Sequence, residues 1–345
     1  MTRKTLLHLV LLAATIAAPL LFPAYNAFLA TLWLFIIVSL TWDMTGGQMG
    51  YNSLGNIFFY GTGMYVGAVI CIGLYFPVAE WTDAARSEIF TLTPNQYYVG
   101  LVLGCLGAGI FCAVSAYIVG MLTFGLRGPY FAIGTLGVAI AAGELVSNID
   151  WLGGGQGISM PNPPGDFDSF KVLVYYLYAG LGVGLFMFLS WFYTTRFGAA
   201  INAIRDDEEK AEAMGIHTLR YKLITWSISA FFIGIAGAIS AFQLIHFEPL
   251  ETAYQTINLG IFMVVCVLLG GKGTLWGPVI GAVMFHLFKE ITWNYFLGWQ
   301  WVALGALIVV IVVFFQDGLM GYLMHRFPEW FGIKVDSKDE RETAS

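Results

Sequence analysis

Four consecutive carboxylates stand in the longest polar stretch of the chain, at Asp206, Asp207, Glu208 and Glu209. Acidic clusters can hold Mg²⁺ through carboxylate oxygens, which is the chemistry of metal-dependent prenyl transferases. Such an enzyme needs a second acidic motif to complete its metal site, and none occurs on the side of the membrane where this stretch is expected. The motifs HExxH and GxSxG are also missing from the sequence. The carboxylates therefore give little support to an enzyme.

A second candidate for chemistry is the run GGKGT at residues 270–274, which is similar to a phosphate-binding loop. Walker A needs a glycine five residues before its final glycine, where Cys266 stands, and Ser or Thr after the lysine, where Gly273 stands. We therefore expect no nucleotide site and no ATP hydrolysis in this chain.

The carboxylates have a better explanation as the start of a short surface helix. Asp206 can cap such a helix, Glu209 is its capping-box partner, and Asp207 and Glu208 add the negative charge that a helix N-terminus favours. Gly215 can end the helix in a left-handed conformation. The sequence predicts a helix over residues 206–214 within a central polar segment, residues 196–222.

Composition says where this segment must lie. Hydrophobic residues make up 58% of the chain and charged residues 11%, which is less than half the charged share of a soluble domain. The net charge of −6 excludes a nucleic-acid partner. The four cysteines lie in apolar stretches without metal-site spacing. Glycine and alanine recur near a spacing of four, which predicts close helix packing in lipid, at Gly100, Gly104 and Gly107; Ala116 and Gly120; Gly180 and Gly184; Ala230, Gly234 and Gly237; and Gly277 and Gly281.

Apolar runs predict an all-α integral membrane protein with about ten transmembrane helices. The runs cover residues 6–22, 28–41, 57–76, 99–124, 130–146, 172–194, 223–245, 257–269, 276–296 and 301–315. The first run could be a cleaved signal peptide, but the nine that follow it favour a retained helix.

The positions of Lys and Arg predict the orientation, because cytoplasmic loops are enriched in them. If all ten runs span the bilayer and the N-terminus is cytoplasmic, 13 of the 16 basic residues are cytoplasmic and only Arg86, Lys171 and Lys289 are not. We therefore expect both termini and the central polar segment in the cytoplasm. A single transmembrane domain is expected over residues 1–330, with a polar C-terminal tail at residues 331–345, in which residues 336–345 are expected to be disordered. The outer loop at residues 148–171 is rich in turn-forming residues and is expected to form an ordered cap.

Polar residues inside the apolar runs are candidates for a translocation path, since they are costly against lipid. Several stand in a glycine-interrupted stretch of the kind that lines cavities in transporters. The candidates are Gln48, Asn52, Ser53, Asn56, Arg127, Tyr130, Thr135, Glu144, Gln243 and Asn258. Each could instead be an interfacial or packing residue. A weak echo between two glycine-rich segments, residues 45–55 and 269–277, leaves an internal repeat open.

The central polar segment resembles the EAA loop of ABC importer permeases, in Glu209, Ala211, Ala213 and Gly215. In detail IRDDEEKAEAMGI is similar to the M-type subunit of branched-chain amino-acid (Liv) permeases. Three further segments agree in order and position: SLGNIFFYGTGMYVGA at 53–68, LRGPYFAIGTLG at 126–137 and LLGGKGTLWGPVIGA at 268–282. The resemblance covers about residues 39–315. Lys210 and Glu212 depart from the EAA pattern, and Asn56 stands where histidine is common.

This resemblance implies a type II-like ABC importer permease of the bacterial inner membrane. Its partners would be a homologous H-type permease subunit, two cytoplasmic ABC ATPases that hold the ATP and Mg²⁺, and an extracytoplasmic substrate-binding protein. This chain itself would carry no cofactor or metal. The substrates would be branched-chain amino acids or similar small amino acids and amides. The residues expected to couple the chain to the ATPases are Arg205, Asp206, Asp207, Glu208, Glu209, Ala211, Ala213 and Gly215.

Two other transport functions stay open on the sequence. A permease of the same family could carry urea or short amides, because no residue is decisive for selectivity. A secondary transporter driven by an ion gradient would need paired ionisable groups deep in the spans, and we expect Glu144 to be the sole acidic candidate there.

Overall fold

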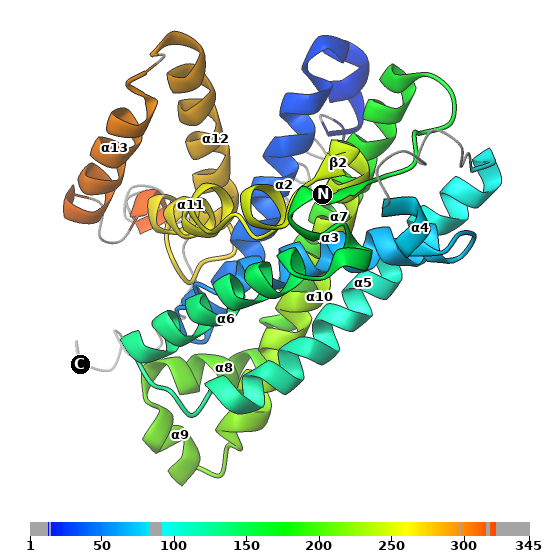
Figure 1. The fold of residues 1–345 in the computed structure, drawn as a ribbon. Coiled ribbons are helices and arrows are strands. Elements are labelled where there is room, and N and C mark those ends of the chain that lie inside the picture. The colour runs from blue at the N-terminus through cyan, green and yellow to red at the C-terminus, as the bar shows by residue number, and fades with distance from the viewer. Residues whose placement is uncertain (1–12, 14, 83–91, 297, 315–317, 322–345) are drawn as a thin grey trace, which may run out of the picture.

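The computed structural model describes residue 13 and residues 15–82, 92–296, 298–314 and 318–321. These residues are mostly helical, as the sequence predicts (Figure 1). The polar tail and the basic residues Arg3, Lys4 and Arg86 lie outside the described residues. The helices are α2 (Asn26–Asp43), α3 (Asn56–Gly73), α4 (Val78–Thr82), α5 (Pro94–Thr123), α6 (Pro129–Ser147), α7 (Phe167–Phe192), α8 (Arg196–Asp206), α9 (Glu208–Ala213), α10 (Thr218–Leu244), α11 (Phe262–Gly270), α12 (Gly277–Tyr295) and α13 (Gln300–Phe314).

Within the described residues, seven helical segments are long and apolar enough to cross a membrane. Six of them contain α2, α3, α5, α6, α7 and α10, and the seventh joins two π-helical turns to α11, over Pro249–Gly270. α12 and α13 are not among the seven: α12 carries His286, Lys289 and Glu290, and α13 is only 15 residues long. Most of the apolar run at residues 6–22 lies outside the described residues.

The centre of the molecule is a packed group of α3, α5 and α10. Figure 1 shows α10 running beside the other two helices. Glycines in these helices stand where two helix backbones approach too closely for a side chain. A Cβ on Gly104 would lie 2.8 Å from the carbonyl oxygen of Gly67, and a Cβ on Gly63 would overlap the backbone of Gly234. These rows of small residues therefore serve close packing, as predicted. Gly180 and Gly184 in α7 are exceptions, since no atom lies within 4 Å of their added Cβ positions.

The loop between α6 and α7 is an ordered cap, as predicted. It contains the two-residue strand β1 (Ile158–Ser159), which pairs antiparallel with β2 (His246–Phe247) after α10. The indole of Trp81 in α4 donates a hydrogen bond of 2.7 Å to the Ser159 carbonyl. These two strands are the departure from the predicted all-α fold. They join the ends of α6 and α10 that lie away from the central polar segment.

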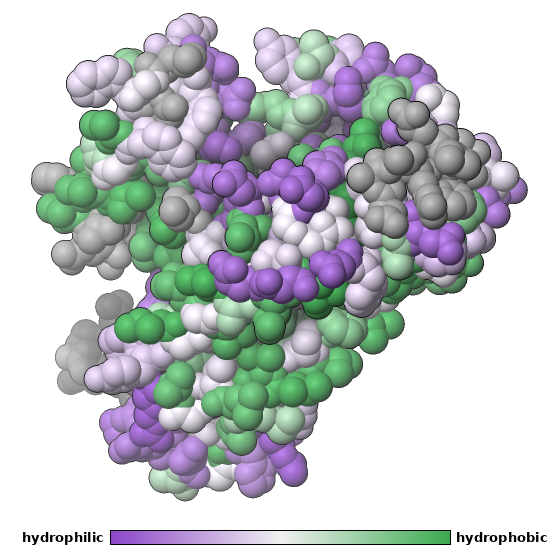
Figure 2. Space-filling view, viewed as in Figure 1, coloured by the Kyte–Doolittle hydropathy of each residue, from purple (hydrophilic) through white to green (hydrophobic). Residues whose placement is uncertain are grey.

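The surface in Figure 2 divides by polarity. Hydrophobic residues cover the α5 and α6 region, and hydrophilic residues gather at the end formed by α8 and α9. α5 alone exposes Val102, Leu106, Ile110, Val114 and Ile118. An exposed apolar stripe of this length belongs in lipid.

Candidate functional site

The central polar segment folds into two helices that meet at Asp207. α8 ends at Asp206, and Asp207 then adopts an extended conformation and caps α9 through its side chain, which accepts the Lys210 backbone N–H at 3.0 Å. A hydrogen bond from the Lys210 side chain, followed by this backbone hydrogen bond, holds the pKa of Asp207 below its usual value. The predicted cap at Asp206 is therefore wrong by one residue. The helix predicted over residues 206–214 is the shorter α9, and a second helix, α8, precedes it.

Gly215 ends α9 as predicted. Its φ of +87° is left-handed, which glycine adopts without the penalty of a Cβ atom. The next amide, of Ile216, donates back to the carbonyl of Ala211 at 3.0 Å. Ala211 is buried, whereas Ala213 and Met214 lie on the exposed end of the helix. One face of α9 is thus packed and its tip is free.

A buried ion pair attaches α9 to the rest of the protein. The Lys222 ammonium, on α10, lies 2.7 Å from Oε1 of Glu208, and their side chains are only 4% and 16% exposed. The Tyr51 hydroxyl accepts a hydrogen bond from Lys222 at 3.0 Å and donates one to Oε2 of Glu208. Burial alone would raise the pKa of Glu208, but the hydrogen bonds from Lys222 and Tyr51 hold it below its usual value. The Glu208 carboxyl is thus ionised, and each of its two oxygens accepts a hydrogen bond.

Aromatic rings enclose this ion pair. The Tyr51 ring packs edge-on against Phe124 and Phe131, with centroids 5.5 Å and 5.2 Å away. The Lys222 ammonium lies 4.6 Å from the centroid of the Tyr51 ring. Burial and the hydrogen bond to Glu208 raise the pKa of Tyr51, so its phenol keeps its proton. The rings cover the Lys222 side of the pair, and its low exposure strengthens the electrostatic interaction.

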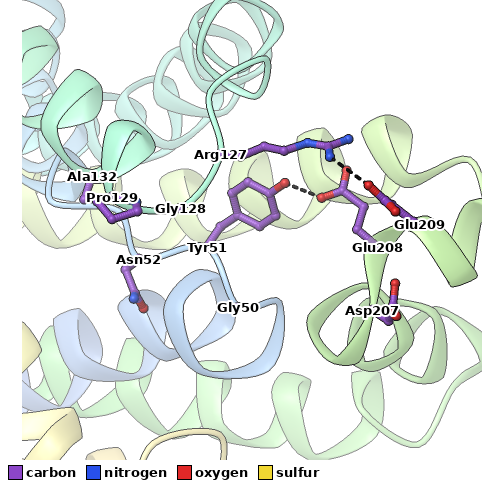
Figure 3. A pocket seen from close by; sticks show the side chains of 10 residues that line it. All are labelled: Gly50, Tyr51, Asn52, Arg127, Gly128, Pro129, Ala132, Asp207, Glu208 and Glu209. Atoms are coloured by element: carbon purple, nitrogen blue, oxygen red, sulfur yellow. Dashed lines mark hydrogen bonds and ion pairs between the residues drawn. The ribbon is translucent and has the colours of Figure 1, made fainter.

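A cavity of about 500 Å³ opens beside the ion pair, between α9, residues 50–52 and the turn before α6. Figure 3 shows Tyr51 pointing to Glu208 and, across the opening, Arg127 pointing to Glu209. The second pair is weaker: its atoms are 3.4 Å apart, and both side chains are largely exposed. α9 is therefore held by the buried contact at Glu208, the exposed contact at Glu209 and the Thr218 hydroxyl, which donates to Glu212 at 2.6 Å.

The two glycine-rich segments, residues 45–55 and 269–277, contact each other. The Gly273 peptide is held on both sides, because its N–H donates to Asp43 at 2.8 Å and its carbonyl accepts from Gln48 at 2.8 Å. Lys272 also donates to the Asn52 side chain at 2.9 Å. The Arg205 side chain on α8 lies against both Gly50 and Gly273. Both glycine-rich segments thus meet the central polar segment.

Asp43 is a residue that sequence reasoning missed. It is 2% exposed, at the end of α2. The sequence carries a signal for it, an acid that closes an apolar run just before a double glycine, so the expectation that Glu144 is the sole deep acid is wrong. Glu144 is instead exposed near the last turn of α6.

Four of the predicted path residues lie together around the first glycine-rich segment. Gln48, Ser53, Asn56 and Thr135 are all buried. The Thr135 hydroxyl accepts the Leu54 backbone N–H at 3.2 Å. Asn56 accepts from the Trp226 indole at 3.4 Å, while its own amide nitrogen has no partner among the described residues. This group is polar, buried and incompletely satisfied.

The other predicted path residues do not join this group. Asn52, Arg127 and Tyr130 are exposed near the α8–α9 end. Gln243 is in the last turn of α10, far from that end, and Asn258 lies in a π-helical turn before α11. Among the described residues, no three His, Cys, Asp or Glu side chains are placed to hold a metal ion.

Known proteins resemble this chain along most of its length. The family described as "Branched-chain amino acid transport system / permease component" matches residues 11–314. The high-affinity branched-chain amino acid transport system permease protein LivM of Escherichia coli is 27% identical over 92% of this chain and 75% of its own length. The probable branched-chain amino acid transport permease protein LivM of Methanocaldococcus jannaschii is 25% identical over 84% of this chain and 91% of its own length. The autoinducer 2 import system permease protein LsrC of Yersinia pseudotuberculosis is 26% identical over 66% and 65%. No solved structure matches.

Proposed function

Because the chain belongs to the family of permease components of branched-chain amino acid transport systems, we propose that it imports branched-chain or similar small amino acids with energy from ATP. The chain is a transport permease and not an enzyme, and it is a multi-pass protein of the bacterial inner membrane. The observation that carries the proposal is the family match over residues 11–314.

For the topology we propose ten transmembrane helices with both termini in the cytoplasm, in a type II-like permease whose single domain covers residues 1–330. The seven long apolar segments support it. α12 and α13 would add two spans, and residues 6–22 the first. With that count the central polar segment is cytoplasmic, on the side where ATP is present.

The central polar segment is proposed to dock onto an ATPase through the tip of α9. Met214 is 83% exposed at that tip, so it is accessible to a partner. The buried face around Ala211 packs α9 against the rest of the protein. The docking residues are the predicted set of Arg205, Asp206, Asp207, Glu208, Glu209, Ala211, Ala213 and Gly215, with Glu208 facing inwards.

For the translocation path we propose the buried polar group Gln48, Ser53, Asn56 and Thr135. Its unpaired amide and its glycine-rich backbone support this assignment, because irregular polar backbone in a membrane protein lines cavities. Asn52, Arg127 and Tyr130 would line the cytoplasmic exit. Glu144, Gln243 and Asn258 stay weaker candidates.

The partners follow from the kind of transport system. We propose a homologous permease subunit, two cytoplasmic ATPases that bind ATP and Mg²⁺, and an extracytoplasmic binding protein that delivers substrate. The names of the relatives from Escherichia coli and Methanocaldococcus jannaschii support branched-chain amino acids over urea and short amides.

Substrate choice can be tested on the cognate binding protein, because a ligand that binds the folded state raises its melting temperature. Leucine, isoleucine and valine are expected to raise it, and urea and acetamide are not. Stabilisation by urea or acetamide alone would contradict the proposed substrate and support the alternative.

A further inference from the structure

Three parts of the chain that are distant in sequence meet at one buried point. Glu208 belongs to α9, Lys222 to α10, and Tyr51 to the first glycine-rich segment. Each of the three polar groups contacts the other two. If α9 is displaced by a partner, Glu208 cannot move away without breaking hydrogen bonds to both neighbours.

We propose that Tyr51 and Lys222 are positioning residues that carry movement of α9 into the first glycine-rich segment, residues 45–55. This inference rests on the proposed function, in which α9 is the part displaced by the ATPases. Because Lys222 is held in the long helix α10, its ion pair limits the directions in which Glu208 can move. Tyr51 receives the movement, since its backbone belongs to the segment that encloses the buried polar group.

The contacts of the first glycine-rich segment show where the movement would go next. The Tyr51 amide donates to the Thr45 carbonyl at 2.9 Å, which closes the segment into a compact loop. The loop contacts α6 through Leu54 and Thr135, and it contacts the second glycine-rich segment through Gln48 and Gly273. A shift of Tyr51 would therefore be passed on to α6 and to the second glycine-rich segment, which both lie beside the buried polar group.

The exposed pair of Arg127 and Glu209 cannot replace the joint formed by Glu208, Lys222 and Tyr51. It is long and solvated, and exposed ion pairs of this kind couple their partners weakly. Arg127 also precedes α6 rather than lying in the glycine-rich segment.

Tyr51→Phe is the decisive variant, because it removes one hydroxyl and leaves the ring packing and the Lys222–Glu208 pair in place. Tyr178→Phe is the control, because it removes another buried tyrosine hydroxyl, which contacts Ser240 and lies outside the proposed path and docking residues. The double variant Glu208→Gln with Lys222→Met removes the charge pair without leaving a single buried charge. All are made in the full complex with its permease partner, ATPases and binding protein, reconstituted in proteoliposomes.

The first readout is the number of leucine molecules imported per ATP hydrolysed. We expect Tyr51→Phe to keep ATP hydrolysis and to lower this ratio about fivefold or more, the lower end of coupling between distant sites. The double variant is expected to act in the same direction, and Tyr178→Phe is expected to keep the ratio. A protein that had merely lost stability would lose hydrolysis and import together.

The second readout needs no substrate. Hydrogen–deuterium exchange is compared without nucleotide and after trapping with ATP and vanadate. In the wild type we expect exchange to change in peptides covering both 208–215 and 45–55, and in Tyr51→Phe only in 208–215. An unchanged leucine ratio together with a wild-type exchange response in 45–55 would overturn the joint. Absence of leucine import by the wild type would instead overturn the proposed substrate, and the exchange comparison would still decide about the joint.

Discussion

The Lys222 ammonium lies 3.0 Å from the Tyr51 hydroxyl, although 171 residues separate the two in sequence. With Glu208 they form a buried, charged contact at the end of the molecule where α8 and α9 lie, and Figure 3 shows its hydrogen bond between Tyr51 and Glu208. A buried ion pair adds little net stability but fixes geometry when all its hydrogen bonds are made. The contact therefore defines how α9 is seated on the transmembrane helices.

The stability of the protein should depend on the ionised form of Glu208. Its pKa in the folded protein is lower than the ordinary value of 4.5, so the stabilisation is complete above about pH 4.5 and is lost as the pH falls through the lower folded value. Melting temperatures of the wild type and Glu208→Gln in detergent should differ at neutral pH and converge in acid. A difference that stays constant across this range would contradict the assignment.

Removing only the cation of the pair should cost more than removing both charges. Lys222→Met leaves the Glu208 carboxylate half-enclosed without its cation, and we expect a loss of about 3 kcal/mol, the lower end for broken buried pairs. Lys222→Met combined with Glu208→Gln should recover a large part of this loss. Chemical or thermal unfolding of the detergent-solubilised protein measures both. Equal stability of the single and double variants would show that the pair is not electrostatically buried.

The contact between the two glycine-rich segments should not tolerate a methyl group. A Cβ on Gly47 would overlap the Asp43 carboxylate and lie 2.7 Å from the Gly273 amide nitrogen, so Gly47→Ala should cost about 2 kcal/mol or more. Gly184→Ala is the control, because its Cβ meets no atom within 4 Å and alanine favours helix. Melting temperatures that fall equally for both variants would contradict the packing described.

The exposed tip of α9 should matter for ATPase binding and not for folding. Met214→Glu places a charge where an apolar side chain is 83% exposed, and we expect about tenfold weaker binding of the ATPase, equivalent to about 1.4 kcal/mol. Tyr295→Glu, at an 80% exposed position at the far end of α12, is the control. Titration of detergent-solubilised permease with ATPase measures the affinity. Unchanged binding by Met214→Glu would remove α9 from the interface.

Local patterns in the sequence predicted local structure well. Most transmembrane helices, the short helix α9 and its end at Gly215 depend on composition or on residues within one turn. The capping residue was wrong by one position because Asp206 and Asp207 are both good caps. Only the backbone decides between them, by ending α8 at Asp206.

Contacts between distant residues could not be predicted in the same way. Nothing in one sequence pairs Lys222 with Tyr51, or Asp43 with the Gly273 amide, because each pairing depends on how helices pack. The buried group around Asn56 and Thr135 was recovered in part, since polar residues inside apolar runs are recognisable. Their separation from Gln243 and Glu144 became visible only from the fold.

The central claim is that this permease moves amino acids with energy from ATP hydrolysed by its partners. The direct measurement is uptake of labelled leucine into proteoliposomes that contain the complete complex, with binding protein outside and ATP inside. We predict uptake that requires ATP and stops when the ATPases cannot hydrolyse it. Uptake by this chain alone under a proton or sodium gradient, without ATP, would contradict the account.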